Sequence, residues 1–118
     1  MLIIKKLILT KEENKLNLNL ENKTVIITGG SDGIGKETAR IMSEEGAKVS
    51  IFARNLQNLE KTKSELEKIT SKKIDIYSVD VTDQEGVKIA VEQVIKKNNK
   101  VDILVNNAGT SSAHPIMN

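Results

Sequence analysis

The chain alternates between short apolar runs and longer segments in which apolar residues recur every three or four positions. Such runs are typical of strands that are buried on both faces, and the recurring positions are typical of amphipathic helices. The predicted strands are residues 24–28, 48–53, 73–79 and 101–105. Because strand and helix alternate, the sequence predicts an α/β fold with a parallel sheet and right-handed crossovers.

Each of the three predicted helices carries an apolar stripe along one face. The stripes consist of Ile34, Thr38, Ile41 and Met42 in the first helix, Leu59, Leu66 and Ile69 in the second, and Val87, Ala90, Val91, Val94 and Ile95 in the third. The first helix is expected to end near Glu45. Thr82 and Glu85 have the spacing of a capping box, so the third helix is expected to begin there and to stop at Asn98 and Asn99.

A glycine-rich turn joins the first strand to the first helix in the order Thr-Gly-x-x-x-Gly-Ile-Gly. Gly29 and Gly30 allow the backbone to bend and to approach a pyrophosphate, and Gly35 allows the helix to pack closely on its strand. Amides at the start of the helix would then face the phosphates. The predicted cradle consists of Gly29, Gly30, Ser31, Asp32, Gly33, Ile34 and Gly35. The alternative is an ordinary connection between a strand and a helix.

The position of this turn after the first strand favours a Rossmann-type doubly wound sheet in the order 3-2-1-4, with the ligand across the carboxyl ends of the strands. The turn differs from the P-loop of ATPases and GTPases. A P-loop needs a hydroxyl for magnesium after its lysine, and here Lys36 is followed by Glu37.

A residue that recognises the ribose is expected about 20 positions after the last glycine of the turn. Arg54 stands nineteen positions after Gly35 and is followed by Asn55, which we include in the predicted site. An arginine can pair with the 2′-phosphate of NADP, whereas NAD needs an acid there. Arg54 as an ordinary surface residue is the alternative, and Asp32 would repel a 2′-phosphate. The sequence thus predicts NADP as the preferred cofactor, with NAD possible.

Two stretches resemble the short-chain dehydrogenase/reductase family: the turn at residues 28–35 and the sequence Asn-Asn-Ala-Gly at residues 106–109. The resemblance runs from about Leu18 to Asn118 and covers roughly the first two-fifths of a typical member. We therefore interpret residues 1–17 as an N-terminal extension and residues 18–118 as a dinucleotide-binding domain that stops after its fourth strand.

The resemblance also implies further cofactor contacts at the strand ends. Asp80 and Val81 match the pair that contacts adenine, although an aspartate at a strand end can also simply cap a turn. Asn107, Ala108 and Gly109 match the segment beside the ribose on the nicotinamide side. Both groups lie where a doubly wound sheet binds its ligand.

Chemistry in this family comes from a serine and a Tyr-x-x-x-Lys pair. The one tyrosine of this chain, Tyr77, has Val81 four positions later, and Ser111 and Ser112 come too early to match the serine. The resemblance thus implies the cofactor-binding fragment of an NAD(P)(H)-dependent oxidoreductase that interconverts a carbonyl (ketone or 3-oxoacyl) and a hydroxyl by hydride transfer. Without a catalytic residue, the fragment alone is expected to be inactive. The alternatives are a noncatalytic module that binds a nucleotide or a partner, and a methyltransferase-like domain.

The composition excludes several other functions. Eighteen basic and sixteen acidic residues give a net charge of +2, which does not indicate a nucleic-acid partner. The chain has no cysteine and one histidine, so neither a disulfide nor a metal site is expected. We therefore expect a cytoplasmic protein whose ligands are a nicotinamide dinucleotide and, in a full-length protein, a small carbonyl or alcohol substrate.

The apolar run at residues 1–9 is interrupted by two lysines and is too short for a membrane span, so we expect an additional N-terminal strand or arm there. No integral membrane span is predicted. The fourth strand of the domain is expected to keep an unpaired edge, which favours association with another chain and makes a homo-oligomer possible.

Overall fold

The computed structural model describes residues 2–4, 19–31 and 33–107, which form one parallel sheet and three helices. The strands are β1 (Leu2–Ile4), β2 (Thr24–Thr28), β3 (Lys48–Ala53), β4 (Ile74–Ser78) and β5 (Ile103–Asn106), and the helices are α1 (Gly33–Glu44), α2 (Leu56–Thr70) and α3 (Gln84–Asn98). No helix within these ranges is long and apolar enough to cross a membrane.

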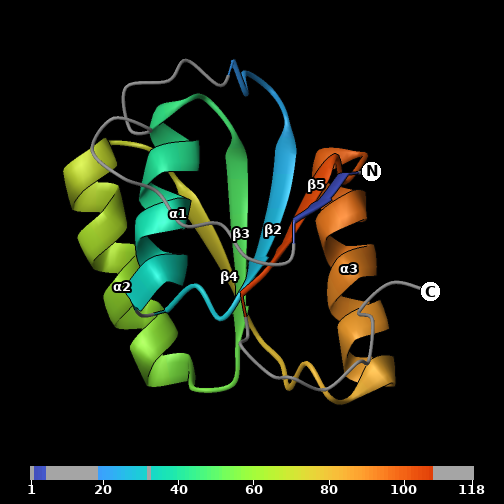
Figure 1. The fold of residues 1–118 in the computed structure, drawn as a ribbon. Helices are drawn as coiled ribbons and strands as arrows, with labels where there is room; N and C mark the ends of the chain where they lie inside the picture. The colour runs from blue at the N-terminus through green and yellow to red at the C-terminus, as the bar shows by residue number, and fades with distance from the viewer. Residues whose placement is uncertain (1, 5–18, 32, 108–118) are drawn as a thin grey trace.

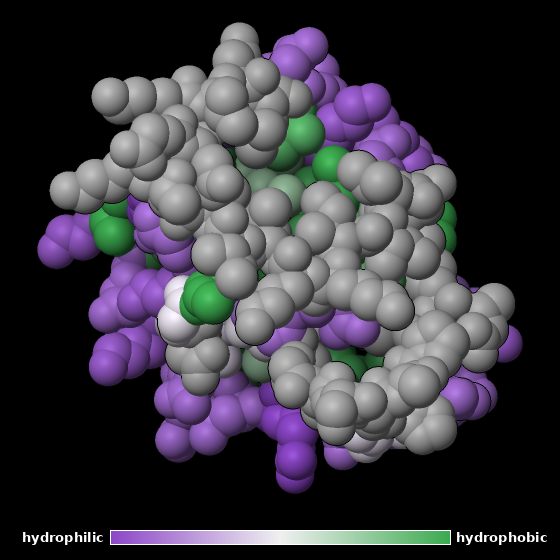
Figure 2. Space-filling view, in the orientation of Figure 1, coloured by the Kyte–Doolittle hydropathy of each residue, from purple (hydrophilic) through white to green (hydrophobic). Residues whose placement is uncertain are grey.

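The sheet order is β1-β5-β2-β3-β4, and every pairing is parallel. The predicted order 3-2-1-4 is thus confirmed for the four strands of the domain. Helices α1 and α2 cover one face of the sheet and α3 covers the other, so the sheet is doubly wound (Figure 1). Figure 2 shows hydrophilic side chains along the outer left of the molecule, where α2 lies.

Successive residues of the central strand β2 enter different cores, which explains why its apolar run is continuous. Val25 and Ile27 pack on the side of α1 and α2, whereas Ile26 packs with Phe52 on the side of α3. All of these side chains are almost fully buried. Burying each contributes about 1.5–3 kcal/mol, so both faces of the sheet stabilise the strand ends at which the predicted site lies.

The outer edge of β5 is paired, and here the expectation of a free edge on the fourth strand is wrong. Leu2, Ile3 and Ile4 stand opposite Ile103, Leu104 and Val105 in the parallel ladder between β1 and β5. The additional N-terminal strand expected in this region is present as β1. It covers the edge because the backbone groups of β5 on that side need hydrogen-bond partners.

Two predictions about the helices are also wrong. The N-cap of α3 is Asp83, whose carboxylate accepts a hydrogen bond from the amide of Gly86 at 3.2 Å, so Thr82 does not cap this helix. The end of α3 agrees with the prediction, since Asn99 follows it in a left-handed conformation. Three residues assigned to the apolar stripes are exposed, and each lies in the first or last turn of its helix, where the helix ends bury less surface: Ile34, Ile69 and Ile95.

Candidate functional site

The predicted site residues follow the carboxyl ends of four neighbouring strands. In the ladders, Thr28 at the end of β2 lies opposite Phe52 in β3 and Asn106 in β5, and Ala53 lies opposite Ser78 in β4. The connections that leave β2, β3 and β4 accordingly lie at one edge of the sheet, at the bottom of Figure 1. The fold therefore brings the residues that follow these strands to the carboxyl edge of the sheet, as predicted: Gly29, Arg54, Asp80 and Asn107.

The glycine turn is in close contact with the first turn of α1. Gly29 has a φ of 70° and Gly33 a φ of 50°, both in the left-handed region that favours glycine. A Cβ on Gly35 would lie 2.3 Å from the carbonyl oxygen of Gly29 and 2.7 Å from Nδ2 of Asn107. A Cβ on Gly30 would lie 2.9 Å from Cγ2 of Ile51. The predicted roles in bending and close packing thus fit the geometry of the turn.

Helix α1 begins directly at this turn and has no acidic residue in its first turn. The start of a helix carries partial positive charge, which favours an anion there. Ser31 is half-buried beside them, and Ile34 is exposed. The helix is twelve residues long, which is enough for a developed dipole.

The hydroxyl of Thr28 connects the ends of β2 and β5. It accepts a hydrogen bond from the amide of Asn107 at 3.0 Å and lies 3.1 Å from Oδ1 of Asn106, to which it can donate. Thr28 is fully buried. This link fixes the backbone of Asn107 relative to the glycine turn.

Arg54 and Asp80 lie near each other at the ends of β3 and β4. The hydroxyl of Ser78 donates to the carbonyl of Arg54 at 2.9 Å, while the Arg54 side chain is exposed. Oδ1 of Asp80 accepts hydrogen bonds from the hydroxyl and the amide of Thr82 at 2.7 and 2.9 Å. These bonds, together with the positive charge of Arg54, hold the pKa of Asp80 below its ordinary value. The site thus combines an ionised carboxylate and a guanidinium that can reach a ligand.

The remaining predicted residues have different surroundings. Asn55 is the N-cap of α2 and accepts a hydrogen bond from the amide of Asn58 at 2.9 Å, so its side chain already has a structural role. Val81 is half-buried and packs against the core beneath α3. Asp32, Ala108 and Gly109 lie outside the described residues.

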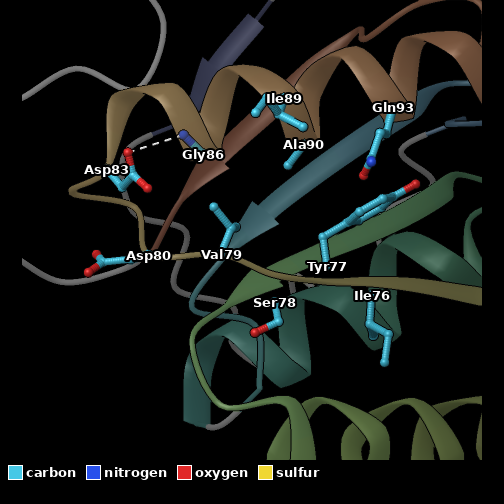
Figure 3. A pocket seen from close by; sticks show the side chains of 10 residues that line it. All are labelled: Ile76, Tyr77, Ser78, Val79, Asp80, Asp83, Gly86, Ile89, Ala90 and Gln93. Atoms are coloured by element: carbon cyan, nitrogen blue, oxygen red, sulfur yellow. Dashed lines mark hydrogen bonds between the residues drawn. The ribbon is translucent and has the colours of Figure 1, made fainter.

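A cavity of about 510 Å³ lies between β4 and α3 and reaches the carboxyl end of β4 (Figure 3). Of the predicted residues that the structure describes, Asp80 is the one that lines it, and its carboxylate points away from the side chains of Val79 and Tyr77. At the other end Tyr77 packs edge-on against Phe52, with ring centroids 5.5 Å apart. Burial raises the pKa of the Tyr77 hydroxyl, so this tyrosine stays neutral.

Sequence reasoning missed three hydroxyl groups that hold this edge together: those of Thr28, Thr62 and Ser78. Thr62 lies on the buried face of α2 between Leu59 and Leu66. A single polar residue within an apolar stripe was the available signal, since a buried hydroxyl needs a partner. Ser78, by contrast, is one of many exposed polar residues, and its sequence position carries no such signal.

Comparison with known proteins identifies the class to which this fold and site belong. The sequence model of the family described as "short chain dehydrogenase" matches residues 23–118. The chain therefore belongs to the short-chain dehydrogenase/reductase family.

Two curated relatives illustrate the match. The chain is 40% identical over 92 residues to 3-oxoacyl-[acyl-carrier-protein] reductase FabG of Thermotoga maritima, with 78% of this chain and 37% of that protein covered. It is 43% identical over 106 residues to dehydrogenase/reductase SDR family protein 7-like of Dictyostelium discoideum, with 86% and 34% covered. The chain thus spans about a third of the length of these relatives.

Solved structures agree with this assignment. L-sorbose reductase from Gluconobacter frateurii, complexed with NADPH and L-sorbose, gives a TM-score of 0.75 at 36% identity, with 86% of this chain and 39% of that chain covered. NAD⁺-bound xylitol dehydrogenase gives a TM-score of 0.72 at 32% identity, with 80% and 36% covered. Of these two neighbours, one is bound to NADPH and the other to NAD⁺.

Proposed function

We propose that this chain is the cofactor-binding part of an oxidoreductase that interconverts a carbonyl and a hydroxyl, and that it prefers NADP(H) to NAD(H). The observation that carries the proposal is the glycine turn. Its backbone lies so close to α1 that Gly35 has no room for a side chain, and it presents the start of that helix at the carboxyl edge of the sheet.

The residues at this edge fit the successive parts of a dinucleotide. Gly29, Gly30 and Ser31, with the start of α1, would hold the diphosphate. Asp80 would accept a hydrogen bond from the adenine amino group, and the backbone of Asn107, fixed by Thr28, would lie beside the second ribose. The cofactor supplies or takes the hydride when it is bound. The chain's own residues bind it and orient it.

The preference for NADP(H) is proposed from charge. Arg54 directly follows β3, which lies beside the strand that leads into the glycine turn, and it is exposed, so its guanidinium can pair with a 2′-phosphate. Such a charge-assisted contact is worth roughly 1.5–3 kcal/mol, which corresponds to a preference of about tenfold to a hundredfold. The negative charge of Asp32 opposes this effect.

Calorimetric titration of an Arg54→Ala variant tests the preference. We expect NADPH affinity to fall about tenfold to a hundredfold and NADH affinity to change less than about threefold. Arg40→Ala is the matched control. It removes the same charge from α1, where Arg40 pairs with Glu37 and Glu44, and should leave both affinities unchanged. Equal losses of NADPH and NADH in Arg54→Ala would show that Arg54 does not recognise the phosphate.

The proposed reaction belongs to a longer protein, since the relatives are about three times as long as the matched region. We propose a ketone or 3-oxoacyl substrate, which the name of the Thermotoga maritima relative supports. The 118 residues alone should bind the cofactor without oxidising it in the presence of a ketone. Turnover followed at the absorbance of NADPH would contradict this. A cytoplasmic location and association into a homo-oligomer remain predictions.

A further inference from the structure

Thr62 makes an unusual contact for a threonine in the middle of a helix. Threonine hydroxyls within helices often donate to the carbonyl four residues earlier, as those of Thr38 and Thr70 do here. The hydroxyl of Thr62 instead leaves α2 and donates to the carbonyl of Ser31 at 2.9 Å. Thr62 is only 3% exposed and Ser31 is half-buried, so this bond is partly shielded from water. It joins α2 to the glycine turn across 31 positions of sequence.

A second contact, one helical turn further along α2, joins this helix to the start of α1. Glu65 forms an ion pair with Lys36, which lies in the first turn of α1. Helix α2 thus contacts both the glycine turn and the start of α1 through neighbouring residues on one face. Because α2 begins immediately after Arg54 and Asn55, it also connects the turn to the residue proposed to recognise the ribose phosphate.

The direction of the Ser31 carbonyl matters for anion binding. A carbonyl oxygen carries partial negative charge and repels a phosphate, whereas amide hydrogens attract it. With its oxygen bound by Thr62, the Ser31 carbonyl is held toward α2 and is not free to turn toward the proposed ligand. Without the hydroxyl, this carbonyl would lack a buried partner and would turn toward water or toward the phosphate site.

We propose that Thr62 is a positioning residue for diphosphate binding, which it serves by fixing the Ser31 carbonyl and hence the shape of the glycine turn. This inference rests on the proposed function, because it concerns the same dinucleotide site. Thr62 itself does not contact the ligand. Loss of the Thr62 hydroxyl should therefore weaken the binding of ligands that contain a diphosphate and leave the binding of ligands without one unchanged.

Two substitutions separate the hydroxyl from the volume of the side chain. Thr62→Val keeps the shape and removes the hydroxyl, and Thr62→Ser keeps the hydroxyl as the matched control. NADPH and adenosine 2′-monophosphate are the probes, because both carry the adenine and the 2′-phosphate but only NADPH carries the diphosphate. We expect Thr62→Val to lower the affinity for NADPH about fivefold to tenfold and to change the affinity for adenosine 2′-monophosphate less than twofold. Thr62→Ser should resemble the wild type with both ligands.

The outcomes distinguish this inference from the proposed function. If wild type and Thr62→Val bind NADPH equally, the positioning role is wrong while the proposed function stands. If the affinities for both ligands fall in parallel, the substitution loosens the domain generally, and the positioning role is again wrong. If the wild type binds neither ligand, the proposed function itself falls, and this inference with it. Should Thr62→Val fail to fold by circular dichroism, Thr62→Ala removes the same hydroxyl and takes its place.

Discussion

Replacing Gly35 by alanine should force the glycine turn away from α1. The added Cβ would lie 2.3 Å from the carbonyl oxygen of Gly29 and 2.8 Å from Cα of Gly30, both of them backbone atoms. It would also lie 2.7 Å from Nδ2 of Asn107. Since ordinary contacts of a Cβ begin at 3.4 Å, the turn and the helix would have to separate by about 1 Å. Gly35 is buried, so no alternative direction is open to the methyl group.

The size of the effect follows from this displacement. Overpacking a well-packed region costs about 1–3 kcal/mol, and the upper end applies because the nearest atoms are backbone. For a domain of this size, each 1 kcal/mol shifts Tm by about 4–8 °C. We therefore expect Gly35→Ala to lower Tm by roughly 12–24 °C. The substitution should also weaken NADPH binding, because the amides of the turn would no longer hold their positions.

Thermal unfolding followed by circular dichroism measures this change, with Gly33→Ala as the control. Gly33 has a φ of 50°, but a Cβ there would meet nothing within 4 Å, so the control adds backbone strain without a clash. That strain costs about 1–2 kcal/mol. If Gly35→Ala unfolds within 4 °C of the wild type, or no lower than Gly33→Ala, the close contact between turn and helix is not as described.

Three further predictions concern stability and association. The buried hydroxyl of Ser50 has no hydrogen-bond partner, so Ser50→Ala should raise the free energy of unfolding in urea by up to about 1 kcal/mol, and a decrease would contradict this. Consecutive amides of a strand point to opposite sides, so replacing both Ile3 and Ile4 by proline must remove an N–H group that faces β5 and break the ladder between β1 and β5. The freed edge of β5 should increase the oligomer fraction in light scattering, whereas valine at both positions should not. The amide of Thr24 donates a hydrogen bond to the carboxylate of Asp102 and lowers the pKa of that carboxyl group. The stability that this bond contributes is therefore present above the ordinary aspartate pKa near 3.9 and is lost as the pH falls below that value. Asp102→Asn should flatten the fall of Tm between about pH 5 and pH 3, and an unchanged acid slope would show that the bond does not matter.

The sequence predicted the order of the strands because local patterns specify it. The glycine turn, the continuous apolar run of β2 and the alternation of strand and helix are all visible within short windows. The placement of Arg54 and Asp80 then followed, since parallel strands bring their carboxyl ends to one edge. These residues lie at that edge in the structure.

Features that depend on distant partners were not predictable in this way. The pairing of β1 with β5 joins residues about a hundred positions apart, and no local pattern names the partner of an N-terminal apolar run. Ile69 fits the helical period of α2, but it lies in the last turn of the helix and is exposed. The cap of α3 shifted to Asp83 because the Thr82 hydroxyl binds Asp80 instead. The bond from Thr62 to Ser31 needs the packing of α2 on the turn, which the sequence alone does not give.

Calorimetric titration of the folded 118-residue chain with NADPH and with NADH tests the central claim most directly. The account predicts saturable binding of one dinucleotide per chain, with NADPH the tighter ligand by about tenfold or more. A folded chain that binds neither nucleotide would contradict the assignment of the glycine turn as a diphosphate site.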